Sequence, residues 1–242
     1  MRPRHRLINP ESAKGSIMKR IISLILLLAT AAMLLAGCSR ASKDIDKINE
    51  CYERSYPHKI VVTSTQQFGA QSLVSTTEMV RGTIGSDFVA KKKSTSEQLR
   101  SIEDGSGIDV YGPIETLKEE VWFRVGLGTT TDKGVTWDEA GENFFPDKGV
   151  IALNLDTDLM DDVVYEDDKM TFKVAKANTK AFFGPETSIT EDVSVVITTG
   201  GGFVTGVEIT WVKPENYATG VEMTTVNIKA EYIYDQQNVT FD

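Results

Sequence analysis

The sequence predicts a mainly β protein of the α+β class, in which one antiparallel sheet carries a few short helices. Apolar and polar residues alternate along several segments of the chain, which is typical of strands with one buried face. Turn residues, above all glycine, separate these segments. Apolar residues at helical spacing occur only in short stretches. Strands joined by turns are therefore expected to make up most of the fold.

The beginning of the chain has the three parts of a secretory signal. The basic pair Lys19 and Arg20 precedes an apolar stretch over residues 21–34, and small residues follow. We expect this signal peptide, residues 1–37, to be removed. The alternative is an uncleaved membrane helix, because the stretch is nearly long enough to cross about 30 Å of hydrocarbon. Met18 directly precedes the basic pair, so it is a second candidate for the start of translation.

The signal ends in a pattern that resembles the lipobox of bacterial lipoproteins. Its four residues are Leu35, Ala36, Gly37 and Cys38. In that family the cysteine sulfur receives a diacylglyceryl group, and the signal is cut between the positions of Gly37 and Cys38. Two acyl chains give a stable membrane anchor, whereas one gives only marginal binding. The resemblance implies a lipid-anchored protein on the extracytoplasmic face of the cell membrane, or on an outer membrane where the host has one.

The predicted mature chain, Cys38 to Asp242, is strongly acidic. It has 205 residues, with 34 acidic and 20 basic side chains and a formal charge of about −14. This charge opposes binding to nucleic acid. The length suits one domain with a full core. We expect a lipidated tether over residues 38–43 and a single domain over residues 44–242.

The domain is predicted to open with a short amphipathic helix. Ile45, Ile48, Cys51 and Tyr52 recur at helical spacing. Cys51 is interpreted as a small apolar core residue rather than a reactive thiol, because the sequence shows no general base beside it. Strands are then expected over residues 59–68, 76–81, 87–93, 119–126 and 134–138. The turns between them are expected at Gly69, residues 82–85 and residues 105–107.

Two short helices and three more strands complete the prediction. Helical spacing of apolar residues favours helices over residues 156–165 and 175–183. Alternation predicts strands beginning at Val193, over residues 203–212, and over residues 223–234. One face of the second strand carries Phe203, Val207, Ile209 and Trp211, and one face of the third carries Val226, Ile228, Ala230, Tyr232 and Tyr234. The run Gly200-Gly201-Gly202 suits a hairpin turn.

This order of elements resembles the outer-membrane lipoprotein carrier (LolA-like) fold and its mycobacterial and Gram-positive lipoprotein relatives. The resemblance is carried by the helix over residues 45–52, the run 60–68, Gly134-Val135-Thr136-Trp137, the helical pieces after Gly149 and the strand over residues 226–232. It implies a strongly curved antiparallel sheet, a half-barrel, wrapped around short helices.

In such a fold the space between sheet and helices can bind an amphiphilic or lipid-like ligand, or a lipidated client. An acyl chain exposed to water costs about 0.8 kcal/mol per methylene, so a carrier must supply an apolar cleft. The candidate lining residues are Phe68, Val121, Phe123, Val125, Phe203, Val207 and Trp211. The alternative is that these side chains fill a core, in a non-catalytic structural or partner-binding surface lipoprotein whose envelope partner the sequence does not identify.

The residue patterns do not predict an enzyme, a cofactor or a metal site. His58 is the only histidine of the mature chain, and no acid or nucleophile motif accompanies it. Metalloprotease, hydrolase and phosphate-loop motifs are absent from the sequence. Seven carboxylates occur between Asp156 and Asp168, but the run lacks the central glycine and terminal glutamate of an EF-hand. We interpret this run as a solvated face rather than a calcium site.

Overall fold

The computed structural model describes residues 43–68, 71–103, 109–146, 151, 153–217, 220–235 and 239. The signal, the lipobox with Cys38, and the predicted turns at Gly69 and residues 105–107 lie outside the described residues. The chain divides into two compact units, Met1–Asp44 and Ile45–Asp242, and the fold below is that of the second. Among the described residues, no helix combines the length and the apolar character needed to cross a membrane.

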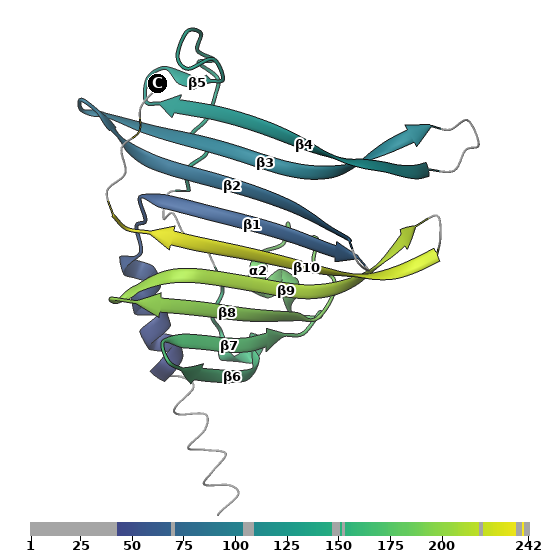
Figure 1. Ribbon diagram of the computed structural model, residues 1–242. Coiled ribbons are helices and arrows are strands. Elements are labelled where there is room, and N and C mark those ends of the chain that lie inside the picture. Colours follow the sequence, from purple (N-terminus) through teal and green to yellow (C-terminus); the bar gives the residue numbers. More distant parts are fainter. Residues whose placement is uncertain are drawn as a thin grey trace, which may run out of the picture. The chain divides into compact units, whose positions relative to one another are not determined.

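Within the described residues, ten strands form one antiparallel sheet in the order β5-β4-β3-β2-β1-β10-β9-β8-β7-β6 (Figure 1). Each strand therefore lies beside its neighbour in sequence, except that β10 pairs with β1 and β5 does not pair with β6. The sheet is open, with β5 and β6 at its edges. The strands are β1 (Lys59–Phe68), β2 (Gln71–Ile84), β3 (Asp87–Glu103), β4 (Asp109–Arg124), β5 (Gly128–Thr130), β6 (Asp161–Glu166), β7 (Lys169–Val174), β8 (Val193–Gly200), β9 (Phe203–Tyr217) and β10 (Gly220–Ile233).

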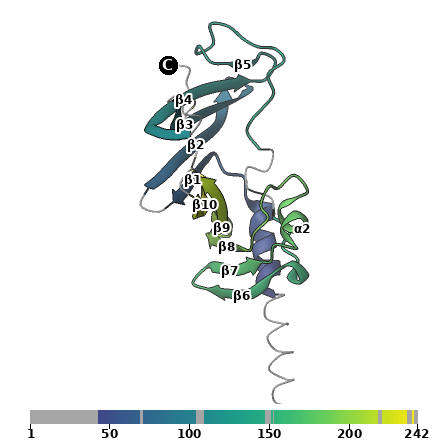
Figure 2. The ribbon, with the colours of Figure 1, turned by 90° about the vertical axis from the view of Figure 1, so that its right-hand side faces the viewer.

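Helices lie on one side of this sheet, which we call the helix side; the opposite side is the outer side. Figure 2 shows the helix over residues 43–54 and α2 (Thr179–Phe183) against the part of the sheet from β6 to β9. A single 3-10 turn, η1 (Thr157–Leu159), precedes β6. The first helix buries Ile45, Ile48 and Cys51, as its amphipathic pattern predicts.

The core fills the space between these helices and the sheet. Alternate side chains of residues 170–174 and 193–197, and the apolar side chains of residues 204–209, are buried in the core. We call these strand segments the covered region. The Phe172 and Phe182 rings meet edge to face, with their centroids 5.5 Å apart. The helix is also tied to β9, because the buried Ser55 hydroxyl donates to the Cys51 carbonyl and accepts from the Val204 amide.

The other half of the sheet is accessible from both sides. We call it the solvated region: residues 61–66 of β1, 73–80 of β2, 91–98 of β3 and 114–121 of β4. Every residue in these segments is half-buried or exposed. Val62 and Met79 still pack against the edge of the core. Cross-strand ion pairs accompany them, with Lys91 2.5 Å from Glu120 on the outer side and Lys92 3.6 Å from Glu119 on the helix side. A single layer of sheet therefore extends beyond the core.

Several predicted elements are confirmed. The strand predicted over residues 59–68 has the bounds of β1, and the strands predicted from Val193 and over residues 223–234 correspond to β8 and β10. Gly201 and Gly202 form the turn between β8 and β9, with φ angles of 60° and 84°. Positive φ at both positions is the geometry of a two-residue hairpin turn, and glycine adopts it without steric cost.

The strand predicted over residues 134–138 is wrong, because these residues form an irregular loop. An isolated bridge joins Asp138 to Thr129 of the three-residue strand β5. The Asp132 carboxylate folds the chain back, because it accepts from the amides of Val135 and Thr136. Lys133 and Gly134 both have positive φ, which a regular strand excludes.

The helix predicted over residues 156–165 is also wrong, because only η1 is helical and β6 follows it. Asp162, Asp167 and Asp168 have positive φ. Asp162 lies at a break in the β6–β7 register, and the other two form the turn between these strands. Of the helix predicted over residues 175–183, only α2 is helical.

Candidate functional site

Four of the predicted lining residues share the helix side of the sheet. The strand register places Val121 and Phe123 of β4 on the same side as Val207 and Trp211 of β9. Val207 is 2% exposed and belongs to the core, whereas Phe123 and Trp211 are half-buried against it. Val121 is half-buried near the edge of the sheet. The set therefore spans the sheet from filled core to edge strand.

The other predicted lining residues lie elsewhere. Val125 is in the turn after β4 and is 53% exposed. Phe203 stacks on Tyr234, with ring centroids 4.8 Å apart. Its neighbour Val204 is fully buried, because a bulge in the β8–β9 register interrupts the alternation of β9. The side chain of Phe68 lies outside the described residues.

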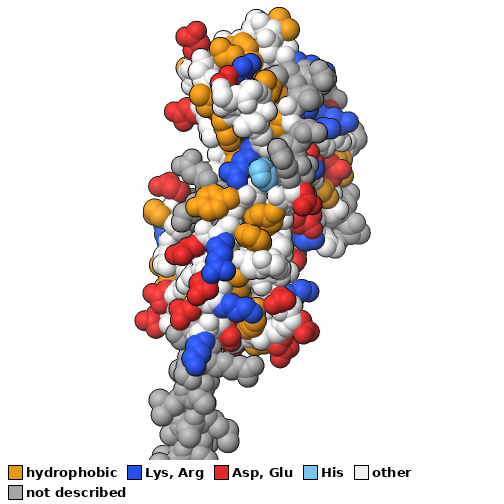
Figure 3. Space-filling view, turned by 90° about the vertical axis from the view of Figure 1, so that its left-hand side faces the viewer, with side chains coloured by type: hydrophobic (Ala, Val, Ile, Leu, Met, Phe, Trp, Pro, Cys, Tyr) orange, Lys and Arg blue, Asp and Glu red, His pale blue; other side chains and the backbone are white. Residues whose placement is uncertain are grey.

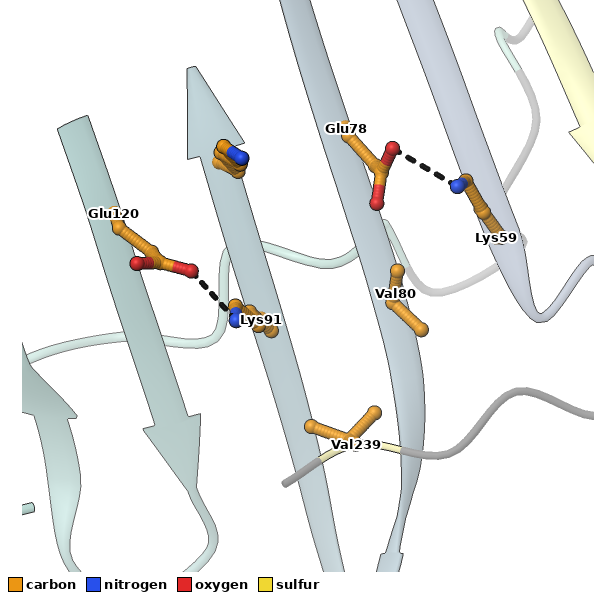
Figure 4. A pocket seen from close by; sticks show the side chains of 7 residues that line it. Lys59, Glu78, Val80, Lys91, Glu120 and Val239 are labelled. Carbon is orange, nitrogen blue, oxygen red and sulfur yellow. Dashed lines mark ion pairs between the residues drawn. The ribbon is translucent and has the colours of Figure 1, made fainter. Parts of the chain in front are cut away.

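A pocket lies on the outer side, where β1 to β4 belong to the solvated region (Figure 4). Its volume is about 250 Å³. It is lined by five charged side chains and two valines, namely Lys59, Glu78, Val80, Lys91, Lys93, Glu120 and Val239. Strand alternation explains the set, because Lys91 and Lys93 are two residues apart and point to the same side.

Two ion pairs cross the pocket between neighbouring strands. The Lys59 ammonium lies 2.8 Å from a Glu78 carboxylate oxygen, and the Lys91 ammonium lies 2.5 Å from Glu120. Lys93 lies opposite Glu78 on β2 and Glu120 on β4, yet it forms no hydrogen bond or ion pair within the described part of the chain. The pocket thus holds three ammonium groups and two carboxylates.

An apolar wall closes the pocket below these pairs. Figure 4 shows Val80 of β2 and Val239, from the C-terminal segment, beside each other. Val239 is 8% exposed. The neighbouring Trp122 ring is buried under Lys91, whose ammonium lies 5.0 Å from the ring centroid. This cation–π contact restricts the Lys91 side chain.

Sequence reasoning missed this pocket, although its charged residues had a visible signal. Three consecutive lysines, residues 91–93, lie at the end of one predicted strand, and Glu119 and Glu120 begin the next. Neighbouring strands bring such runs opposite each other. Val239 had no such signal, because its position depends on where the chain runs after β10.

Other titratable groups belong to the core at the end of the first helix. Burial raises the pKa of the Cys51 thiol and raises that of Tyr52 well above its ordinary value. Burial also raises the pKa of Tyr232 to about 12, and its hydroxyl accepts from the Ile151 amide. His58 lies at the entrance to β1, where its amide donates to the Ile233 carbonyl. These groups pack between secondary-structure elements.

The acidic run serves the backbone and nearby cations. Asp156 caps η1 by accepting from the Asp158 amide, and Asp162 lies 2.8 Å from Lys173. The Asp162 carboxylate thereby raises the pKa of Lys173. Asp168 accepts from the Tyr165 hydroxyl. In the described ranges, no group of three or more His, Cys, Asp or Glu side chains is arranged to hold a metal ion.

Comparison with known proteins assigns no family. No model of a known protein family matches the chain. No curated protein sequence matches it either. The function is therefore argued from the residues and their geometry.

Proposed function

We propose that this protein is a non-catalytic cell-envelope lipoprotein that binds a partner through the solvated region of its sheet. The observation that carries the proposal is the two-sided exposure of β1 to β4 beyond the core. Strands of 14, 17 and 16 residues at β2, β3 and β4 are much longer than the common five or six. Such length exceeds what the core requires, and the excess forms a large polar surface.

The membrane anchor in this proposal is the diacylglyceryl group on Cys38. From Cys38 to Ile45 the chain spans at most about 25 Å. The helix that follows lies over β6 and β7, because Lys47 donates to the Tyr165 hydroxyl at 2.7 Å and its ammonium lies 3.8 Å from Asp168. Strands lie about 4.8 Å apart, so β4, eight strands from β6, is held about 38 Å along the sheet. The solvated region would face away from the membrane.

Surface charge supports a partner other than nucleic acid or an anionic membrane. Figure 3 shows acidic side chains gathered at the end of the molecule where the first helix and β6 to β7 lie, with basic ones between them. The acidic surface near the anchor would repel anionic headgroups. Lipid attachment would then hold the domain at the membrane. The acidic surface would keep the domain from lying flat on the bilayer, so that the solvated region could contact a partner.

Amphiphile binding is the second candidate function. It requires the strongly curved half-barrel and an apolar concavity on the helix side, and it is favoured by the half-buried Phe123 and Trp211. The covered region argues for the first candidate, because Phe172, Val195 and Val207 already fill the space under the helices.

Site-specific photo-crosslinking in cells distinguishes the two functions. A photoreactive residue at Ser94 or Ser96 in the solvated region should yield one discrete protein adduct, and the same residue at the exposed Lys180 of α2 should yield none. Mass spectrometry of the extracted protein should find no stoichiometric lipid besides the anchor. If one amphiphile is bound per protein and neither serine position gives an adduct, the partner-binding proposal is refuted and amphiphile binding is supported.

The two cysteines of the mature chain provide a matched test of the anchor. Replacing Cys38 with Ala should move the protein from the membrane fraction to the soluble fraction and abolish labelling by a radioactive fatty acid. Replacing the buried Cys51 with Ala should leave both properties unchanged. Membrane association that survives the Cys38→Ala change would refute the lipid anchor.

A further inference from the structure

We infer that the outer-side pocket between β1 and β4 is a binding site for a small monocarboxylate with a compact apolar body. The pocket joins an ammonium-rich rim to an apolar wall in one cavity. This inference is independent of the partner proposed above, which would use a larger surface. It assigns a ligand class to residues that the sequence patterns did not single out.

The charge of the pocket favours an anion. Lys59 and Lys91 each hold a carboxylate, at 2.8 Å and 2.5 Å, which leaves Lys93 as the surplus cation. The pocket therefore carries a formal charge of about +1 within a mature chain of about −14. A local excess of positive charge in an acidic protein attracts anions to this cavity rather than to the rest of the surface. Lys93 is the expected primary contact.

The single surplus positive charge of the pocket favours a monoanion over phosphate. A carboxylate matches the single surplus charge, whereas a phosphate dianion would add repulsion from Glu78 and Glu120, which both line the cavity. Two of the three ammonium groups, those of Lys59 and Lys91, are also held in place before binding. The Lys91 side chain is fixed by Glu120 and by the Trp122 ring, so little side-chain entropy remains to be lost there.

The apolar wall and the volume set the size of the ligand. Val80 and Val239 provide a surface that a hydrocarbon body can cover. A water molecule takes about 30 Å³ of liquid volume, so a cavity of about 250 Å³ holds the equivalent of about eight waters, which suits a ligand of roughly seven or eight non-hydrogen atoms. Pentanoate has this combination of one carboxylate and a short chain.

Calorimetric titration of the protein purified from membranes in detergent micelles tests the site with four probes. Pentanoate should bind saturably at one site, acetate more weakly because it cannot reach the valines, and pentanol and inorganic phosphate should give no saturable heat at matched ionic strength. Replacing Lys93 with Gln should weaken pentanoate binding at least tenfold. Replacing Val239 with Ser should weaken pentanoate binding several-fold and leave acetate binding unchanged.

The matched control is the Lys118→Gln variant, which removes the same charge from the outer side of β4 outside the pocket. Its pentanoate affinity should equal that of the parent protein. Thermal unfolding of each variant should match the parent, so that lost binding is not lost folding. Equal weakening by both lysine changes, or equal and unsaturable heats from all anions, would show an adventitious ion only and overturn the inference. Saturable binding of pentanol would show an apolar cleft without anion selectivity and overturn it as well.

Discussion

Two regions on the helix side of the same sheet are built by different rules. One row of paired residues crosses the sheet from β9 to β4 through Val207, Ala230, Val62, Thr77, Ser94 and Glu119. The row begins in apolar residues under the first helix and ends in hydroxyls and a carboxylate in water. Burial stabilises its first part, and backbone pairing with polar cross-strand contacts supports its second. A sheet anchored by one core can therefore extend as a single solvated layer.

The largest difference in unfolding free energy between the two regions should come from truncating an apolar side chain in each. Phe172→Ala should lower the free energy of unfolding by about 3–5 kcal/mol, because Phe172 is fully buried and its loss leaves a cavity beside Phe182. Leu117→Ala in the solvated region should change it by less than about 1 kcal/mol, since Leu117 is 50% exposed. Denaturant unfolding measures both values. Equal losses of unfolding free energy in the two variants would contradict the description of Leu117 as solvent-exposed.

A matched pair of serine changes should give the next largest difference. Ser55→Ala should cost about 1–3 kcal/mol, because it leaves the buried Val204 amide without the acceptor that lies at 2.9 Å. Ser94→Ala should cost less than about 0.5 kcal/mol, since water replaces the 3.2 Å contact with the Thr77 hydroxyl. Urea titration of the two variants is the measurement. A cost for Ser94→Ala as large as for Ser55→Ala would contradict the description of two regions.

The ion pair between Lys59 and Glu78 should contribute a smaller amount, which salt reduces. The side chains are 22% and 41% exposed, so a double-mutant cycle with Lys59→Met and Glu78→Gln should give a coupling of about 0.2–1 kcal/mol. The coupling should fall when salt is raised from 0.05 to 1 M, values chosen to span roughly 14 to 3 Å of screening length. A coupling energy that does not change with salt would indicate that this ion pair is shielded from solvent in the dissolved protein.

The smallest expected effect is a local loss of order in acid. Hydrogen bonds from the hydroxyls of Thr130 and Thr136 lower the pKa of Asp132 from its ordinary 3.8 to about 2. Because the pKa is depressed in the folded state, its stabilising contribution is present above pH 3.8 and is lost as the pH falls through about 2. The amide resonances of Val135 and Thr136 should shift over this range, and Asp132→Asn should remove that shift. A transition centred near 3.8 would show that the loop is open in solution.

The accuracy of the strand predictions follows this division only in part, because β1 of the solvated region was predicted with its exact bounds and β7 of the covered region was not predicted. Where one face of a segment is dry, alternation predicted β8 and most of β10, and helical spacing predicted the first helix. In the solvated region both faces are wet, so β3 runs ten residues beyond Lys93 with no apolar alternation to predict it. The strand prediction stopped where the buried face stops.

Backbone conformation accounts for the remaining errors. Leu159, Met160 and Val163 have helical spacing, but residues 161–166 extend into β6 because Asp167 and Asp168 make the tight turn that pairs them with β7. The spacing of apolar residues does not reveal this choice. The charged lining of the outer-side pocket could have been found by pairing the lysines of one predicted strand with the glutamates of the next, whereas Val239 could not.

The short length of β5 would have a consequence for a protein held at a membrane by the proposed anchor. Among the described residues, β5 pairs with β4 only from Trp122 to Arg124, so most of β4 presents an edge. Lipid-anchored molecules meet their own copies far more often than freely diffusing ones, and bare strand edges join readily. Lys118, Glu119 and Glu120 place charge along this edge, and a copy approaching in register would meet like charge. Under the proposed anchor, this charge would therefore discourage edge-to-edge pairing between neighbouring copies on the membrane.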